Sequence, residues 1–228
     1  MMTDEIILEE EGGESIFEET EEEGGFEELI RYTIPGYVLG LLLGVVLDGF
    51  GLQMNPIGRW LVRTFAGESE SFFEGIFALR QRIQGKARGM AEAYGWGKFI
   101  GLGVPWVIDW GSRAVGVDLL GVQGFYIPFF YGMSDQLMAS VTGFVFLRRR
   151  EGSWGGAFSS YIRHPVMISG LILVLGLPLL LLFGRIAGFR PETQVLAAAE
   201  TMAANLCWIP PLVGTIAERR QQSGQGEA

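Results

Sequence analysis

The chain has 228 residues, of which 49% are apolar and 19% are charged, and its mean hydropathy is +0.29. The apolar residues form blocks of about twenty residues that are nearly free of charge, which is typical of a membrane protein rather than of a soluble domain. The formal net charge of −9 arises mainly near the N-terminus, because thirteen of the 26 acidic residues lie between positions 4 and 28. No basic run is interleaved with aromatic residues, so the composition indicates no nucleic-acid partner.

Cysteine and histidine each occur once, as Cys207 and His164. An intrachain disulfide is therefore excluded, and a His/Cys metal site within one chain is excluded as well, since at least three ligands are normally needed. A site made of carboxylates alone, or one shared between subunits, stays open. We predict no metal. The acidic N-terminus also lacks the positive region and apolar core of a cleavable signal peptide.

Residues 1–33 form an acidic, low-complexity segment in which Glu9–Gly13 recurs as Glu21–Gly25. Charge repulsion and a shortage of apolar residues predict a disordered tail. It can be a solvated tail that aids solubility, or an arm whose few apolar residues anchor on a basic partner surface.

The membrane domain is expected over residues 34–220, and its first span over about 35–50. Gly36, Gly40 and Gly44 recur every four residues in this span, and Asp48 continues the line, so all four lie on one helix face. Small residues at this spacing let two helix backbones approach closely in lipid. The pattern predicts a tight helix contact, either within the chain or with a partner.

A basic connection follows, with an amphipathic helix expected over about residues 70–90. Its apolar residues form one mostly apolar face, and its arginine and lysine side chains can bind anionic lipid headgroups. We therefore expect the helix to lie in the membrane interface. The alternative is a helix packed on the rest of the protein.

Four further spans are expected over about residues 94–110, 125–147, 166–183 and 194–216, followed by a short polar tail at 221–228. The last of these spans is interrupted by Pro210 and Pro211. The fold class is therefore an all-α integral membrane protein, a bundle of about five transmembrane helices with one interfacial helix and a disordered acidic tail.

Orientation follows from the lysines and arginines of the short loops. With the N-terminus outside and the C-terminus in the cytoplasm, twelve of them lie in cytoplasmic segments and four in outer segments. We therefore expect a multi-pass protein of the cell membrane with this topology.

Four carboxylates lie within or at the edge of the expected spans: Asp48, Asp109, Asp135 and Glu200. Ionisable groups inside a bilayer are costly and usually face the bundle interior. Asp135 and Glu200 could line a proton or cation path if their helices meet, or each carboxylate could simply specify helix packing. Lys98 is expected at an inner boundary, so no intramembrane lysine or arginine is expected as a counter-ion.

The segment Tyr161–Pro165 carries an Arg-His-Pro sequence at the start of the expected fourth span. It resembles the signature of the membrane methyltransferases that act on isoprenylcysteine and phospholipids. The resemblance implies that Arg163 and His164 help to hold S-adenosylmethionine, and we predict no cofactor unless this methyltransferase alternative applies. Met167 stands where that family usually has tyrosine, and the family's paired glutamates after the last helix are missing. The alternative is that Arg163 and His164 are interfacial residues and Pro165 a first-turn proline.

The function expected first is that of a non-enzymatic structural or interaction subunit of a membrane assembly. Its partners would be the lipid bilayer and other membrane subunits, or further copies of the chain, with the acidic tail as a binding arm. An ion or proton channel or carrier that uses Asp135 and Glu200 is one alternative. A methyltransferase that uses Arg163 and His164 is the other.

Overall fold

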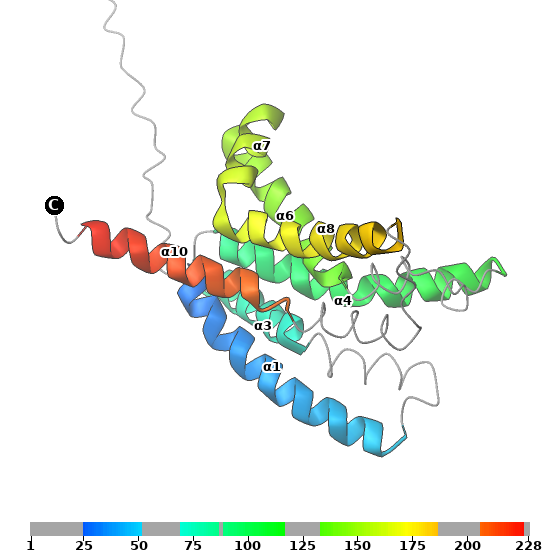
Figure 1. Cartoon of the computed structure of the whole chain (residues 1–228). Helices are drawn as coiled ribbons and strands as arrows, with labels where there is room; N and C mark the ends of the chain where they lie inside the picture. Colours follow the sequence, from blue (N-terminus) through cyan, green and yellow to red (C-terminus); the bar gives the residue numbers. More distant parts are fainter. Residues whose placement is uncertain (1–24, 52–68, 87–88, 117–132, 187–205, 226–228) are drawn as a thin grey trace, which may run out of the picture.

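The computed structural model describes residues 25–51, 69–86, 89–116, 133–186 and 206–225, and this part of the chain is helical without any strand. The helices are arranged as in Figure 1 and are α1 (Gly25–Gly49), α3 (Ser69–Ile83), α4 (Met90–Ala114), α6 (Ser134–Glu151), α7 (Trp154–Arg163), α8 (Pro165–Ile186) and α10 (Ile209–Gln225).

The helices extend several of the expected spans. α4 and α8 cover residues 94–110 and 166–183 completely, while α1 begins at Gly25, ten residues before the expected start of the first span. Residues 25–33, expected as part of a disordered tail, are thus helical. The reason lies in tertiary contacts, because the Glu218 carboxylate accepts hydrogen bonds from the backbone N–H groups of Phe26 and Glu27, both at 2.9 Å. These are the helix-start donors that otherwise lack partners.

The third and fifth spans can be compared only in part. Residues 125–132 and 194–205 lie outside the described residues, as do residues 1–24 of the tail. α10 begins just before Pro210 and Pro211, so both prolines occupy its first turn, where a missing N–H donor costs nothing.

α3 packs between α1 and α4 instead of lying alone in an interface. It buries its polar side, with Glu70, Ser71 and Glu74 all fully buried, and leaves Leu79 and Ile83 47% and 76% exposed. An interfacial helix would turn its polar side to the headgroups, so the structure differs here from the sequence prediction. The cause is a set of polar partners on α1, α4 and α6.

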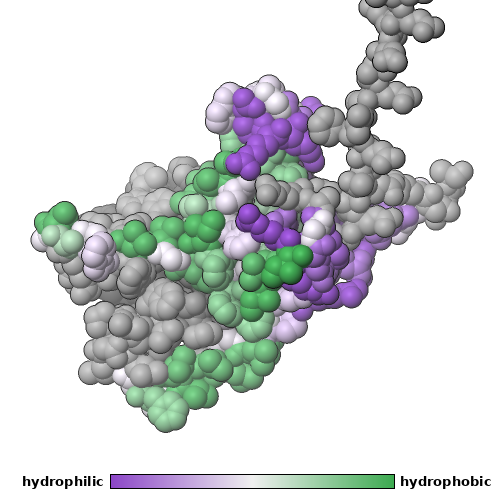
Figure 2. All heavy atoms as spheres, turned by 180° about the vertical axis from the view of Figure 1, so that it is seen from behind, coloured by the Kyte–Doolittle hydropathy of each residue, from purple (hydrophilic) through white to green (hydrophobic). Residues whose placement is uncertain are grey.

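The same inverted pattern holds for α6, which buries Asp135 and Gln136 while Val141 and Val145 are 45% and 44% exposed. A water-soluble bundle buries its apolar side chains and exposes its polar ones. Figure 2 shows hydrophobic residues over a large part of one face, with hydrophilic residues gathered toward one end. The described surface therefore suits an apolar surrounding better than water.

Charged side chains from distant parts of the sequence meet at this end of the bundle. Glu27 of α1 forms an ion pair with Arg219 of α10 at 3.0 Å, and Glu28 lies 3.2 Å from Arg80 and 3.3 Å from Lys86. We call this region the charged end. The expected topology puts the start of α1 and the end of α10 on opposite sides of the membrane, and the Glu27–Arg219 contact does not fit that arrangement.

One helix among the described residues, Gly25–Leu47 of α1, is long and apolar enough to cross a membrane by its length and composition. α7 and the part of α8 up to Gly176 meet the same criterion only together, and they are bent by 83° at their junction.

Candidate functional site

The centre of the bundle holds four acidic or basic side chains without solvent exposure: Glu70, Glu74, Lys98 and Asp135. They come from α3, α4 and α6, and we call them the charged centre. Such groups are almost never fully buried unless they are paired or bind an ion. Their arrangement follows from how closely the three helices approach.

Glycines on α4 bring its neighbours close. A Cβ on Gly95 would lie 2.6 Å from the backbone oxygen of Glu74, so only glycine permits this approach of α3. A Cβ on Gly97 or Gly101 would collide with the α6 backbone at Ala139 and Asp135. Lys98 lies between the two glycines of this contact, so its side chain enters the α4–α6 interface.

Lys98 is the cation of the centre. Its Nζ donates a short hydrogen bond to Oδ2 of Asp135 and lies 3.6 Å from Oε1 of Glu70. The prediction that no intramembrane lysine is available as a counter-ion is therefore wrong for Asp135. Because α4 is eight residues longer than the span expected at 94–110, Lys98 lies inside the bundle and not at a boundary.

Asp135 has further partners on both oxygens. Ser71 Oγ donates to Oδ2 at 2.7 Å, while the backbone N–H of Gln136 donates to Oδ1 at 2.6 Å. The Sγ atom of Cys207, in the turn before α10, lies 3.9 Å from the same Oδ1. The lysine and the thiol thus lie toward different oxygens of one carboxylate.

The two glutamates are less well satisfied. Glu74 Oε1 accepts a hydrogen bond from Thr33 Oγ1 of α1 at 2.7 Å, but its Oε2 has no hydrogen-bond partner among the described residues. Neither oxygen of Glu70 has one in this part of the chain. Three carboxylates thus surround one ammonium group, and full ionisation would leave a net charge of −2 at the centre. An ionised carboxylate without compensation costs several kcal/mol in such surroundings, so the centre demands protons or another cation.

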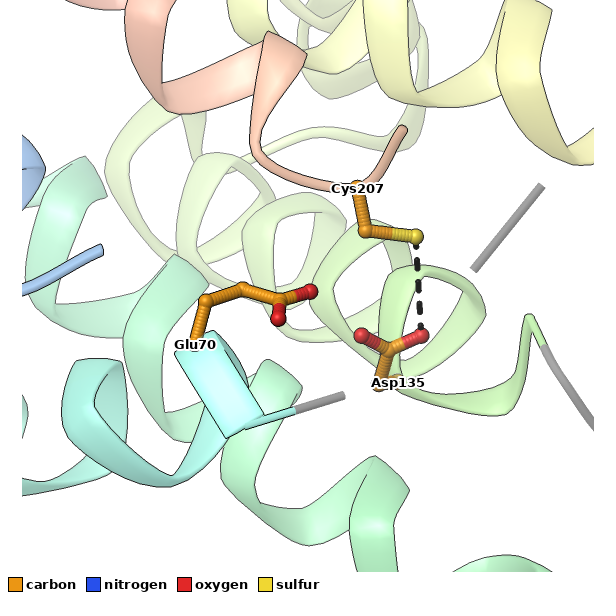
Figure 3. A group of neighbouring side chains, drawn as sticks. All are labelled: Glu70, Asp135 and Cys207. Carbon is orange, nitrogen blue, oxygen red and sulfur yellow. Dashed lines mark hydrogen bonds between the residues drawn. The ribbon is translucent and has the colours of Figure 1, made fainter. Parts of the chain in front are cut away.

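Three side chains of this region could hold a metal ion. Glu70, Asp135 and Cys207 each offer a ligand atom, all within 4.8 Å of one another, and all three side chains are buried. Figure 3 shows them approaching one another from α3, α6 and the turn before α10.

The remaining predicted residues lie away from the charged centre or outside the described part of the chain. Gly36 is buried in α1 and a Cβ there would lie 2.7 Å from the Phe73 ring of α3, so this part of the glycine face meets a helix of the same chain. Gly40 is also buried. Gly44 and Asp48 belong to α1, and Asp109 belongs to α4; the structure describes their backbone only. Glu200 lies outside the described residues.

Arg163 and His164 lie where α7 ends and α8 begins, outside the expected span 166–183. Arg163 is exposed, while the His164 ring packs against Phe26 with 6.0 Å between centroids, and its Nδ1 is buried without a hydrogen-bond partner in the described chain. Burial, and to a smaller extent the charge of Arg150, lower the pKa of His164 below its usual range. His164 is thus neutral at pH 7, which gives it no charge with which to attract the carboxylate of S-adenosylmethionine.

Sequence reasoning singled out Asp135 but missed Glu70, Glu74, Lys98 and Cys207. Two signals were present. Glu70 and Glu74 are four residues apart and alternate with the apolar Phe72, Phe73 and Ile76, so the carboxylates share one side of a helix. Lys98 stands inside a Gly-x-x-x-Gly sequence, where a helix contact is to be expected.

Comparison of the chain with protein-family models, with curated proteins and with solved structures finds no match. The charged centre is therefore the feature of the molecule that indicates a function.

Proposed function

We propose that this protein is a multi-pass membrane carrier that binds a small cation at the charged centre and moves it across the bilayer. The observation that carries the proposal is the buried set of Glu70, Glu74, Lys98 and Asp135 inside a bundle with an apolar surface. Ionisable residues at such a position typically line ion pathways or proton relays, because their burial is too costly for packing alone.

The charges of the centre support a cation as the bound species. Lys98 compensates one carboxylate, and the two that remain attract positive charge. Lys98 also keeps Asp135 from being an uncompensated buried anion when the transported cation leaves, so the empty carrier is still stable. This requirement distinguishes a carrier from a purely structural subunit, the function expected first from the sequence, which needs no buried charge at all.

The proposed orientation places the charged end in the cytoplasm. Basic residues of five segments gather there, from α1, α3, α6, α7 and α10, and membrane proteins keep such residues on the cytoplasmic side. The start of α1 and the end of α10 then share the cytoplasmic side, and the chain crosses the bilayer an even number of times.

Flux measurements on the purified protein in sealed liposomes test the proposal. A concentration gradient of H⁺, Na⁺, K⁺ or Zn²⁺ should drive uptake above that of protein-free liposomes for at least one ion. We expect Lys98→Met and Asp135→Asn to abolish this uptake, whereas Glu151→Gln, at the exposed end of α6, should keep it. Size-exclusion chromatography of each variant in detergent controls for folding. Wild-type protein that moves none of these ions would overturn the proposal.

A further inference from the structure

We propose that Glu70, Asp135 and Cys207 form a binding site for a divalent transition-metal ion of the Zn²⁺ and Co²⁺ class. The proposal deepens the carrier function by naming the cation, and it depends on that function only where the ion is treated as cargo. Binding itself can be measured in detergent without transport.

The three ligand atoms already have the spacing that such an ion needs. They lie within 4.8 Å of one another, and the Cys207 sulfur is 3.9 Å from Oδ1 of Asp135. Metal–ligand distances of about 2.0–2.3 Å put neighbouring ligands of a tetrahedral ion about 3.3–3.7 Å apart, so small side-chain movements suffice. The three residues come from separate elements, so the folded bundle assembles the site.

Glu70 provides an independent sign of a missing ligand. Its carboxylate is fully buried, points toward Asp135 and Cys207 in Figure 3, and has no hydrogen bond on either oxygen within the described chain. Its polar contact in this part of the chain is the 3.6 Å ion pair with Lys98, a cation that Asp135 shares. A buried carboxylate usually accepts several hydrogen bonds, since its desolvation is otherwise uncompensated. A metal ion between the three side chains would supply that compensation.

The sulfur atoms select the kind of metal. Cys207 contributes a thiol, and the thioether sulfur of Met133 lies 3.9 Å from it. Mg²⁺ and Ca²⁺ bind oxygen ligands, whereas thiolates favour Zn²⁺ and related ions. The mixed set of two carboxylates and one thiolate therefore fits a borderline d-block ion.

The charge of the site agrees with a divalent ion. Two carboxylates and a thiolate carry three negative charges, and Lys98 supplies one positive charge on the Oδ2 side of Asp135. A divalent ion on the Cys207 side makes the sum of these four side chains and the ion zero, and Glu74, which is not a ligand, adds nothing to that sum when it is protonated. Three protein ligands also leave one coordination position open, as in exchangeable sites and unlike the closed four-ligand sites of structural zinc.

Cobalt absorption tests the site in purified protein, with any purification tag removed. Because Cys207 is the only cysteine, a sulfur-to-Co²⁺ charge-transfer band in the near ultraviolet can come from this thiol alone. We expect one Co²⁺ per chain with this band, displaced by Zn²⁺ and kept in excess Mg²⁺. Cys207→Ser should remove the band, and Glu70→Gln should weaken Co²⁺ binding more than about 100-fold, beyond the usual effect of losing an outer partner.

Two variants serve as controls. Glu92→Gln changes another buried carboxylate of the bundle, and His164→Ala removes the only histidine, so neither should alter the spectrum or the affinity. Cobalt binding that survives Cys207→Ser with an unchanged spectrum would mean an adventitious ion only, and no binding by the wild type would overturn the proposal equally. Binding without flux would contradict the carrier function alone, while flux of another ion without Co²⁺ binding would contradict the metal site alone.

Discussion

At the scale of single residues, Lys98 supplies the positive charge that stabilises the buried carboxylates of the charged centre. Its ammonium group is fully buried and bonded to Asp135, while Glu70 lies within ion-pair distance. Breaking such a pair by removing one partner leaves a buried charge uncompensated, which costs more than replacing both partners together. The centre therefore depends on the pair as a unit.

A pair of variants measures this dependence. Lys98→Met should lower the free energy of unfolding by about 3–5 kcal/mol, because Asp135 loses its counter-ion. Adding Asp135→Asn should restore part of that loss, since the amide still accepts from Ser71 and carries no charge. Circular dichroism of unfolding in detergent provides the measurement. Additive losses in the double variant would show that the two side chains do not depend on each other.

At the scale of the helices, glycines on α4 set the distances from which the centre is built. Gly97 and Gly101 let α6 approach so closely that no side chain fits between the backbones. In an apolar solvent this packing, and not the hydrophobic effect, holds two helices together. The position of Lys98 relative to Asp135 follows from the contact.

The substitution Gly101→Ala tests the importance of this approach. The new methyl group would collide with the backbone of Asp135, which cannot move as a flexible side chain does, so we expect a loss of stability of about 1–3 kcal/mol. Gly103→Ala is the matched control, because a Cβ there meets nothing within 4 Å. The midpoint of thermal unfolding should fall for the first variant and stay unchanged or rise for the second. Equal midpoints would argue against a tight α4–α6 contact.

At the scale of the whole molecule, the charged end fixes which segments share a side. Glu218 and Arg219 of α10 bind the first turn of α1, so these two ends of the described chain cannot lie on opposite sides of a bilayer. Phe50, at the other end of α1, is 78% exposed and lies a full helix length away.

Labelling with a membrane-impermeant maleimide tests this arrangement in intact cells. In a Cys207→Ser background, cysteines introduced by Arg31→Cys and Ser223→Cys should both resist labelling from outside. A cysteine from Phe50→Cys should react there, because it lies beyond the other end of α1. Lysed cells provide the control for reactivity. Opposite accessibility of positions 31 and 223 would contradict the shared charged end.

Much of this architecture could be predicted from the sequence. Apolar blocks determined the helices at 94–110 and 166–183, and the Gly36 spacing indicated a close helix contact, because hydropathy and small-residue spacing are local properties. Asp135 was recognised as a candidate because a charged residue inside an apolar stretch is evident from the neighbouring sequence alone.

Only the tertiary structure decided the role of α3 and the composition of the centre. The alternating polar and apolar residues of α3 fit an interfacial helix as well as a buried one. Periodicity shows which residues share a face of a helix, but not what that face contacts. Glu70, Lys98, Asp135 and Cys207 lie far apart in sequence and carry no common motif. They become one site because glycine contacts bring three helices together beside the turn that carries Cys207. The sequence around Lys98 or Glu70 indicates a helix contact at most, and does not say which distant residue that contact meets.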